Sequence, residues 1–179
     1  IAEQYATLDI ITGGRLIVGV ALGYREIEYN NFGVVKKTRG RLFSEQVDAL
    51  KVLWEQDNAC FEGEFINFED LSIRPKSLQK PRPPVWIGAA ANQGIKRAAL
   101  KGDAWIATSM TTYSAIKEQV EYYKQVRQEA GLPANKGFTK CVELYVAETR
   151  EKAFEEGAPY LANKYKAYYS WGMGDNVPG

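Results

Sequence analysis

The 179-residue chain has no histidine and only two cysteines, Cys60 and Cys141. The cysteines are far apart in the sequence, and neither belongs to a pair at the short spacing of metal ligands. Zinc chemistry and a serine–histidine triad both depend on residues that are missing here. The sequence therefore excludes both within this chain and predicts no metal site.

The chain also lacks a charge surplus and a long apolar run. Lys and Arg number 23 against 22 Asp and Glu, and a net charge of +1 gives no electrostatic footprint for nucleic acid or an anionic membrane. No apolar stretch approaches the roughly 20 residues that span a bilayer, and neither end resembles a signal peptide. We expect a cytoplasmic protein.

With 45% hydrophobic residues, residues 1–179 are long enough to bury one core and should form a single domain or part of one.

The sequence does contain an alternation of helical and strand patterns. Apolar spacing predicts helices over 1–11, 43–56, 92–102 and 114–131, and one after Thr149 that Pro159 kinks or restarts. Short apolar runs predict strands at 16–21, 85–88, 103–109 and 140–147, the first of them buried on both faces. Aromatic residues around Gly63 predict an additional hairpin. This order favours a parallel sheet, either open and doubly wound or part of a (β/α) barrel.

In both architectures, ligands bind just past the carboxyl ends of the strands. Small residues dominate there, which lets a ligand approach the backbone, and amides at the start of a helix capped by Asn92 could hold a phosphate. From these residues alone, ordinary tight turns are the simpler interpretation, and Arg25, Glu26 and Glu28 are consistent with a solvated loop. Ser114 is predicted to cap the next helix, and Trp86 and Trp105 to fill the core. The strand-end positions are Leu22, Gly23, Tyr24, Ala89, Ala90, Ala91, Asn92, Thr108, Ser109, Glu148 and Thr149.

Several long motifs resemble the luciferase-like flavin monooxygenases, the group that includes bacterial luciferase and deazaflavin-dependent reductases. The resemblance covers residues 1 to about 150, in "ATLDIITGGRLIVGVALGYREIEYNNFGV", "RGRLFSEQVDALKVLW", "FEGEFINFEDLSIRPKSLQKPRPPVWIGA" and "KGDAWIATS". It implies a partial (β/α)8 TIM barrel, an α/β fold in which this chain supplies roughly strands four to seven with their helices. Two sheet edges and an apolar inner face would then be exposed.

The same resemblance implies a flavin site. The turn after the first strand, at Ala21, Leu22 and Gly23, would pack against the isoalloxazine ring, with Tyr24, Arg25 and Glu26 at the mouth. The turn at Ala89, Ala90, Ala91 and Asn92 would hold the flavin phosphate, with Thr108 and Ser109 close by. The catalytic histidine that the family usually uses comes from strands absent here, so no catalytic residue is predicted.

Three functions remain open at this point. The first is a monooxygenase that uses reduced FMN and O2 on a small organic substrate and depends on a flavin reductase. The second is hydride transfer with the deazaflavin coenzyme F420, and the third is a flavin-binding or half-barrel protein without turnover. The incomplete barrel also predicts a homo-oligomer or the remainder of a longer barrel as a partner.

Overall fold

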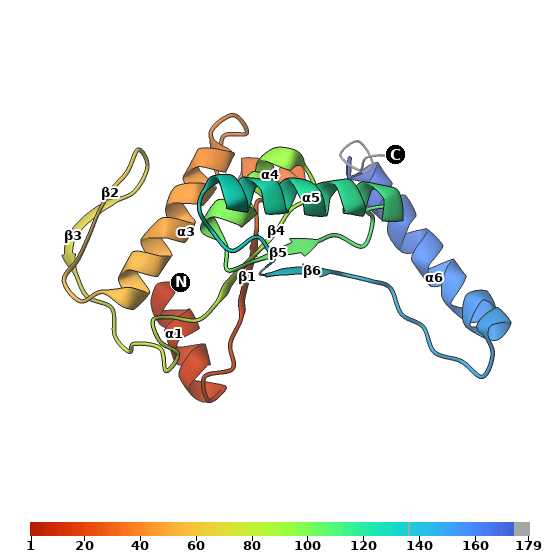
Figure 1. Cartoon of the computed structure of the whole chain (residues 1–179), viewed down its shortest axis with the longest axis horizontal. Coiled ribbons are helices and arrows are strands. Elements are labelled where there is room, and N and C mark those ends of the chain that lie inside the picture. Colours follow the sequence, from red (N-terminus) through yellow and green to blue (C-terminus); the bar gives the residue numbers. More distant parts are fainter. Residues whose placement is uncertain (136, 174–179) are drawn as a thin grey trace.

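The computed structural model describes residues 1–135 and 137–173 of the chain (Figure 1). Strands and helices alternate along most of this length, as the sequence pattern predicts. In chain order the elements are α1 (Ala2–Ile11), β1 (Val18–Ala21), α2 (Glu26–Asn31), α3 (Arg39–Glu55), β2 (Ala59–Glu62), β3 (Asn67–Leu71), β4 (Val85–Gly88), α4 (Asn92–Lys101), β5 (Ala104–Ala107), α5 (Tyr113–Glu129), β6 (Phe138–Lys140) and α6 (Arg150–Ser170).

Four strands form one parallel sheet in the order β1-β4-β5-β6. The register is regular, with Val18 opposite Val85 and Gly88 opposite Ile106, so each successive βα unit adds one strand to the same edge. Helices α3, α4 and α5 lie together on one side of this sheet (Figure 1). Sequential parallel strands joined by helices on one side are the arrangement of a (β/α) barrel, whereas a doubly wound sheet carries helices on both faces.

The core lies between the sheet and these helices. On β4, Val85 and Ile87 are almost completely buried against the helices, while Trp86 is only half-buried on the opposite face. Trp105 and Tyr123 are fully buried and stack with their ring centroids 5.5 Å apart. The prediction of a core position is therefore confirmed for Trp105 and wrong for Trp86, because residues that alternate along a strand point to opposite faces.

The first strand is shorter and more exposed than the sequence predicts. It begins at Val18 rather than at residue 16, and Gly19 and Ala21 are exposed while Val18 is 1% exposed. Only the face toward the helices is covered in the described part of the chain. The prediction of a strand buried on both faces is wrong for that reason.

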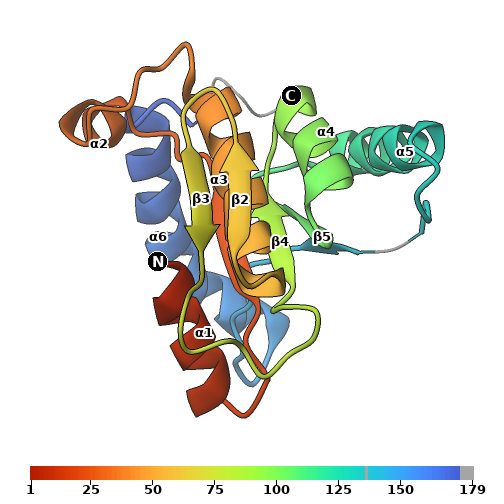
Figure 2. The ribbon, with the colours of Figure 1, turned by 90° about the vertical axis from the view of Figure 1, so that its left-hand side faces the viewer.

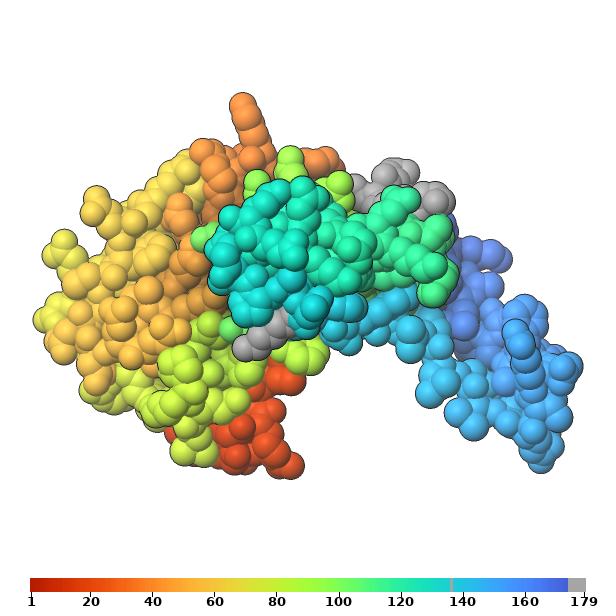
Figure 3. Space-filling model, viewed as in Figure 1, coloured from red at the N-terminus to blue at the C-terminus, as the bar shows by residue number. Residues whose placement is uncertain are grey.

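The prediction of a last strand at 140–147 is also wrong. Strand β6 covers Phe138–Lys140, and beyond the bond from the Cys141 amide to the Ala107 carbonyl, residues 141–147 are not a strand. Val142, Leu144 and Val146 are 71%, 85% and 80% exposed. A strand needs a neighbour for its hydrogen bonds, and β5 is too short to pair with this segment. Figure 3 shows this segment and α6 standing away from the rest of the molecule, with a hollow between them and the part that carries α1.

The predicted hairpin is confirmed as β2 and β3, which lie along α3 (Figure 2). Its tip is fixed by the Glu45 carboxylate, which accepts hydrogen bonds from the amides of Glu64, Phe65 and Ile66 at 2.8–3.2 Å. These bonds position the hairpin against the start of α3. The hairpin and α3 therefore hold each other in place.

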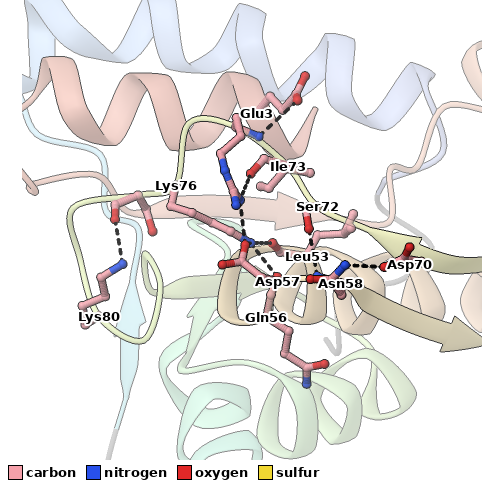
Figure 4. A network of polar contacts seen from close by, with 12 residues as sticks. Glu3, Leu53, Gln56, Asp57, Asn58, Asp70, Ser72, Ile73, Lys76 and Lys80 are labelled. Atoms are coloured by element: carbon pink, nitrogen blue, oxygen red, sulfur yellow. Dashed lines mark hydrogen bonds and ion pairs between the residues drawn. The ribbon is translucent and has the colours of Figure 1, made fainter.

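The segment after the hairpin fastens the other end of α3 (Figure 4). Lys76 donates to the carbonyls of Leu53 and Gln56, at 2.8 and 2.5 Å, and lies 3.3 Å from Asp57. The last carbonyls of a helix have no partners within it, and a lysine there satisfies them while opposing the negative end of the helix dipole. Both ends of α3 are thus anchored, and its first turn is presented to the carboxyl edge of the sheet.

The final helix, α6, runs without interruption through Pro159, so the predicted restart at that residue is wrong. Two rings at its end approach the turn after β1: Tyr168 and Trp171 lie 6.3 and 6.5 Å from Tyr24. Arg25 lies over the Trp171 ring at 4.5 Å. The end of α6 therefore lies beside the turn that follows β1.

Candidate functional site

A pocket of ≈ 770 Å³ opens at the carboxyl ends of β1, β4 and β5. Parallel strands bring their carboxyl ends to one edge of the sheet, which is why turns from distant parts of the sequence meet here. Eight of the ten residues predicted to bind the cofactor line the pocket, namely Ala21, Leu22, Gly23, Tyr24, Ala89, Ala90, Ala91 and Thr108. The volume lies within the range of about 300–1,000 Å³ that is usual for small-molecule and cofactor sites.

Asn92 and Ser109 do not line this pocket. The prediction that Asn92 caps α4 is also wrong: Ala91 is the N-cap, and Asn92 is the first helical residue, with an exposed side chain. The cap prediction at Ser114 fails similarly, because Thr112 is the N-cap of α5 and accepts the Ala115 amide. In both cases the helix begins one or two residues before the expected position.

The turn from β4 into α4 has its carbonyl groups tied to the scaffold. The Ala89 carbonyl accepts from the indole nitrogen of Trp105 at 2.9 Å, and the Ala90 carbonyl accepts from Nε2 of Gln119 at 2.8 Å. The Ala91 carbonyl accepts the first helical bond, from the Ile95 amide at 2.9 Å. All three carbonyls are thus occupied by donors from β5, α5 and α4.

The amide groups of the same turn, in contrast, have no hydrogen-bond partners in the described chain. Among the described residues, no acceptor lies within hydrogen-bonding distance of the amides at 90–93. Those of Asn92 and Gln93 are the first amides of α4, where the helix dipole adds a partial positive charge. Anchored carbonyls and available amides are the arrangement that suits an anion at the start of a helix.

Gln119 anchors the turn after β4 and was not predicted from the sequence. It lies on α5, is 4% exposed, and its Oε1 is buried without a hydrogen-bond partner in the described chain. The side-chain amide of Gln119 therefore uses only its donor, and the bond to the Ala90 carbonyl holds this side chain in its buried position. The available signal was a polar residue placed between Ile116 and Tyr123 on the apolar face of the helix.

The turn after β1 forms the opposite wall. Gly23 has a φ of +77°, which L side chains rarely adopt, so the chain can turn sharply there. Leu22 and Phe43 add apolar surface, and Tyr24 stands at the mouth against the end of α6. Burial raises the pKa of the Tyr24 phenol, as does the neighbouring Tyr168. Arg25 and Glu26, also expected at the mouth, sit at the start of α2, and neither lines this pocket.

The third strand-end loop contributes Thr108. Lys140, the last residue of β6, donates to the carbonyls of Thr108 and Thr111, both at 2.9 Å. The hydroxyls of Thr108 and Thr111 lie 3.2 Å apart. The loop is therefore fixed from the neighbouring strand, and Thr108 can present its side chain to the pocket.

Basic residues are the largest feature of the pocket that the sequence analysis did not predict. They come from the segment before α3, from its first turn and from the second turn of α4. The run "KKTRGR" at 36–41 was a visible signal, but a balanced total charge conceals a local cluster. The five residues are Lys36, Lys37, Arg39, Arg41 and Arg97.

Over residues 1–135 and 137–173, no group of three His, Cys, Asp or Glu side chains is placed to hold a metal ion. Within the same ranges, no helix is long and apolar enough to cross a bilayer.

A parallel sheet with its helices on one side and a pocket at the carboxyl ends of its strands defines an α/β protein of the (β/α) barrel class. A sequence model of the luciferase-like monooxygenase family matches residues 1–176, and the chain belongs to this family. The sequence-based recognition and the prediction of a partial TIM barrel are both confirmed.

Individual relatives agree with this assignment. The chain is 36% identical over 123 residues to an FMNH2-dependent dimethylsulfone monooxygenase of Pseudomonas putida, covering 67% of this chain and 34% of that protein. It is 32% identical over 132 residues to an F420-dependent glucose-6-phosphate dehydrogenase of Kineococcus radiotolerans, covering 68% of this chain and 38% of that protein. In fold it resembles the monooxygenase RslO1 of Streptomyces bottropensis, with a TM-score of 0.84 and 24% identity. The match covers 97% of this chain and 54% of RslO1. The chain thus spans between a third and about half of the length of these proteins.

Proposed function

We propose that the chain forms the cofactor-binding half of a flavin-dependent oxidoreductase, a monooxygenase that uses reduced FMN and O2 on a small organic substrate. The observation that carries this proposal is the turn at 89–93, whose carbonyls at 89–91 are anchored while its amides at 90–93 remain available. A turn of this kind, at the start of a ten-residue helix, is suited to a terminal phosphate.

The residues of the turn fit a phosphate closely. Gly94 packs so tightly that an added Cβ would lie 2.9 Å from the Cβ of Ala89, which keeps the first turn of α4 pressed against the end of β4. The small side chains of Ala90 and Ala91 leave the amides accessible. Amides at a helix start offer hydrogen bonds and a partial positive charge without any need for lysine.

The opposite wall fits a flat, largely apolar ring. Ala21, Leu22 and Gly23 bring backbone and short side chains to the pocket, and Phe43 adds an aromatic face. Such surfaces bind planar rings by apolar contact and exclude water from them. When bound, the reduced flavin supplies the electrons of the reaction, and this chain would contribute binding, orientation and exclusion of water.

A second candidate is hydride transfer with the deazaflavin F420, which the match to the Kineococcus enzyme favours. Both cofactors would use the same phosphate turn. Binding of reduced FMN and reduced F420 to the same preparation distinguishes these functions, and binding without turnover would identify the non-catalytic alternative.

The proposal includes completion of the barrel. Residues 1–179 would belong to a single domain, and β1 and β6 lack outer neighbours in the described chain. The remaining strands would come from a longer polypeptide or from a second copy, covering Val142, Leu144 and Val146. A catalytic group, the substrate pocket and the contact with a flavin reductase would depend partly on that completed barrel, in the cytoplasm.

The phosphate assignment is tested by comparing FMN with riboflavin, which has the same ring but no phosphate. Titration of each into the chain, followed by flavin fluorescence, should give an FMN affinity at least about tenfold higher, since charged hydrogen bonds contribute about 1.5–3 kcal/mol each. Equal affinities would contradict the phosphate turn. Failure of both to bind would contradict the flavin proposal itself.

A further inference from the structure

The pocket contains more positive charge than a cofactor phosphate requires. Five cationic side chains line it, and none of the described residues that line it is acidic. The whole chain has a net charge of only +1, so this is a local concentration. A cleft with one sign of charge attracts ligands of the opposite sign.

Two of the five cations already have counter-ions at the rim. Lys36 lies 3.2 Å from Glu26, and Arg41 lies 3.1 Å from Glu64. The four side chains are 49–63% exposed, and ion pairs of this kind are weak and screened by salt. A further anion would therefore be bound by cations that lie deeper in the pocket.

Arg39 is one of these deeper cations. Its guanidinium lies over the Tyr29 ring, 4.6 Å from the centroid, and its Nη1 is buried with no hydrogen-bond partner in the described chain. The side chain borders both this pocket and an adjoining one of ≈ 330 Å³. A buried cationic nitrogen without an acceptor is unfavourable, so a bound anion would stabilise it.

Arg97 is the second deeper cation. Its Nε donates to the Ser44 hydroxyl at 2.9 Å, and its guanidinium lies 5.9 Å from the centroid of the Phe43 ring. It forms no ion pair within the described chain, and burial lowers the pKa of its guanidinium. A Cβ on Gly40 would lie 2.8 Å from its Nη2, so Arg97 reaches the residue directly after Arg39. Both arginines therefore meet the pocket at the start of α3.

We propose that Arg39 and Arg97 form a second anion site in this pocket, separate from the phosphate turn, which holds the acidic group of an organic-acid substrate. A planar guanidinium matches a carboxylate in shape and charge better than any other side chain does. Phe43, which borders Arg97, would contact the hydrocarbon part of the acid. This inference rests on the proposed function, because it assigns the phosphate turn to the cofactor and the arginines to the substrate.

The first test compares benzoate with benzamide, a neutral molecule of nearly the same shape. Calorimetric titrations of the full chain, with and without FMN, should show at least about tenfold tighter binding of benzoate. The preference should fall as salt increases, because salt screens charge attraction. Equal affinities for the two probes would overturn the proposal.

Variants identify the residues responsible. Arg39→Gln and Arg97→Gln should each remove most of the benzoate preference, while Arg39→Lys should retain part of it by keeping the charge. Arg41→Gln is the matched control: it removes a guanidinium from the same pocket, but one that is paired with Glu64, and should leave the preference intact. Circular dichroism would verify that each variant is folded.

The result that overturns the assignment is equally specific. If Arg39→Gln and Arg97→Gln reduce FMN affinity but not riboflavin affinity, these residues hold the cofactor phosphate. Benzoate selectivity in a chain that binds neither flavin would support the second anion site and refute the flavin proposal. The two failures are therefore distinguishable.

Discussion

Replacement of Gln119 by leucine should weaken FMN binding through the phosphate turn, although Gln119 itself is buried behind it. The substitution removes the donor that holds the Ala90 carbonyl at 2.8 Å and leaves that carbonyl without a partner. An unsatisfied buried carbonyl costs about 1–3 kcal/mol. The carbonyl can recover a partner only if the turn rotates, which would turn the neighbouring amides away from the pocket.

If the turn rotates to relieve about 1.4 kcal/mol or more of that cost, FMN affinity should fall about tenfold or more. Riboflavin affinity should change little, because its ring contacts the opposite wall. Stability should fall less than the lost bond suggests, since leucine also removes the unpartnered Oε1. The assay is the ratio of FMN to riboflavin affinity, together with the free energy of unfolding in urea.

The matched control is Gln125→Leu, the same replacement on the exposed side of α5, where Gln125 bonds only Glu129. It should leave the affinity ratio unchanged. The reasoning is refuted if Gln119→Leu lowers the affinities for FMN and riboflavin by the same factor, or lowers neither while remaining folded.

Three further predictions concern the same edge of the sheet. Asn92→Asp should lower FMN but not riboflavin affinity, because it adds a negative charge beside the available amides, and should leave the melting temperature nearly unchanged; an unaltered FMN affinity would argue against the phosphate turn. Gly94→Ala should reduce both FMN affinity and stability, since its Cβ would lie 2.9 Å from that of Ala89, and a variant as stable and as tight as the original would contradict the packing. Burial raises the pKa of Asp103, but hydrogen bonds and charge from Arg82 outweigh it and leave the pKa below its usual value. The ionised Asp103 therefore stabilises the fold above about pH 4, and this stabilisation is lost as pH falls through the lowered pKa. Asp103→Asn should destabilise the chain at pH 7. It should also make the free energy of unfolding in urea less sensitive to acid between about pH 5 and 3.

The sheet and its helices could be predicted because each has a local signature. The apolar run 85–88 and the apolar spacing in α3 belong to elements whose buried faces are set within a few residues of sequence. The turn at 89–93 could be predicted for the same reason, since a strand followed at once by a helix fixes where its amides lie. The resemblance to a known family added the assignment of flavin to that turn.

The features that were missed depend on distant contacts. Residues 141–147 have the composition of a strand, but their conformation depends on a neighbour that the described chain does not supply. The role of Gln119 depends on α5 passing behind Ala90, which its own helical pattern does not reveal. Arg39 and Arg97 line the same pocket only because α3 and α4 pack side by side, so their combined charge is a property of the fold.

The central claim is that turns at the ends of β1 and β4 form a flavin site. The most direct measurement is anaerobic titration of the purified chain with reduced FMN and with reduced F420, with the assembly state followed by sedimentation in the same samples. The account predicts saturable binding of at least one of them, with one cofactor for each phosphate turn. Absence of saturable binding for both, in a sample that sedimentation and circular dichroism show to be folded, would contradict it.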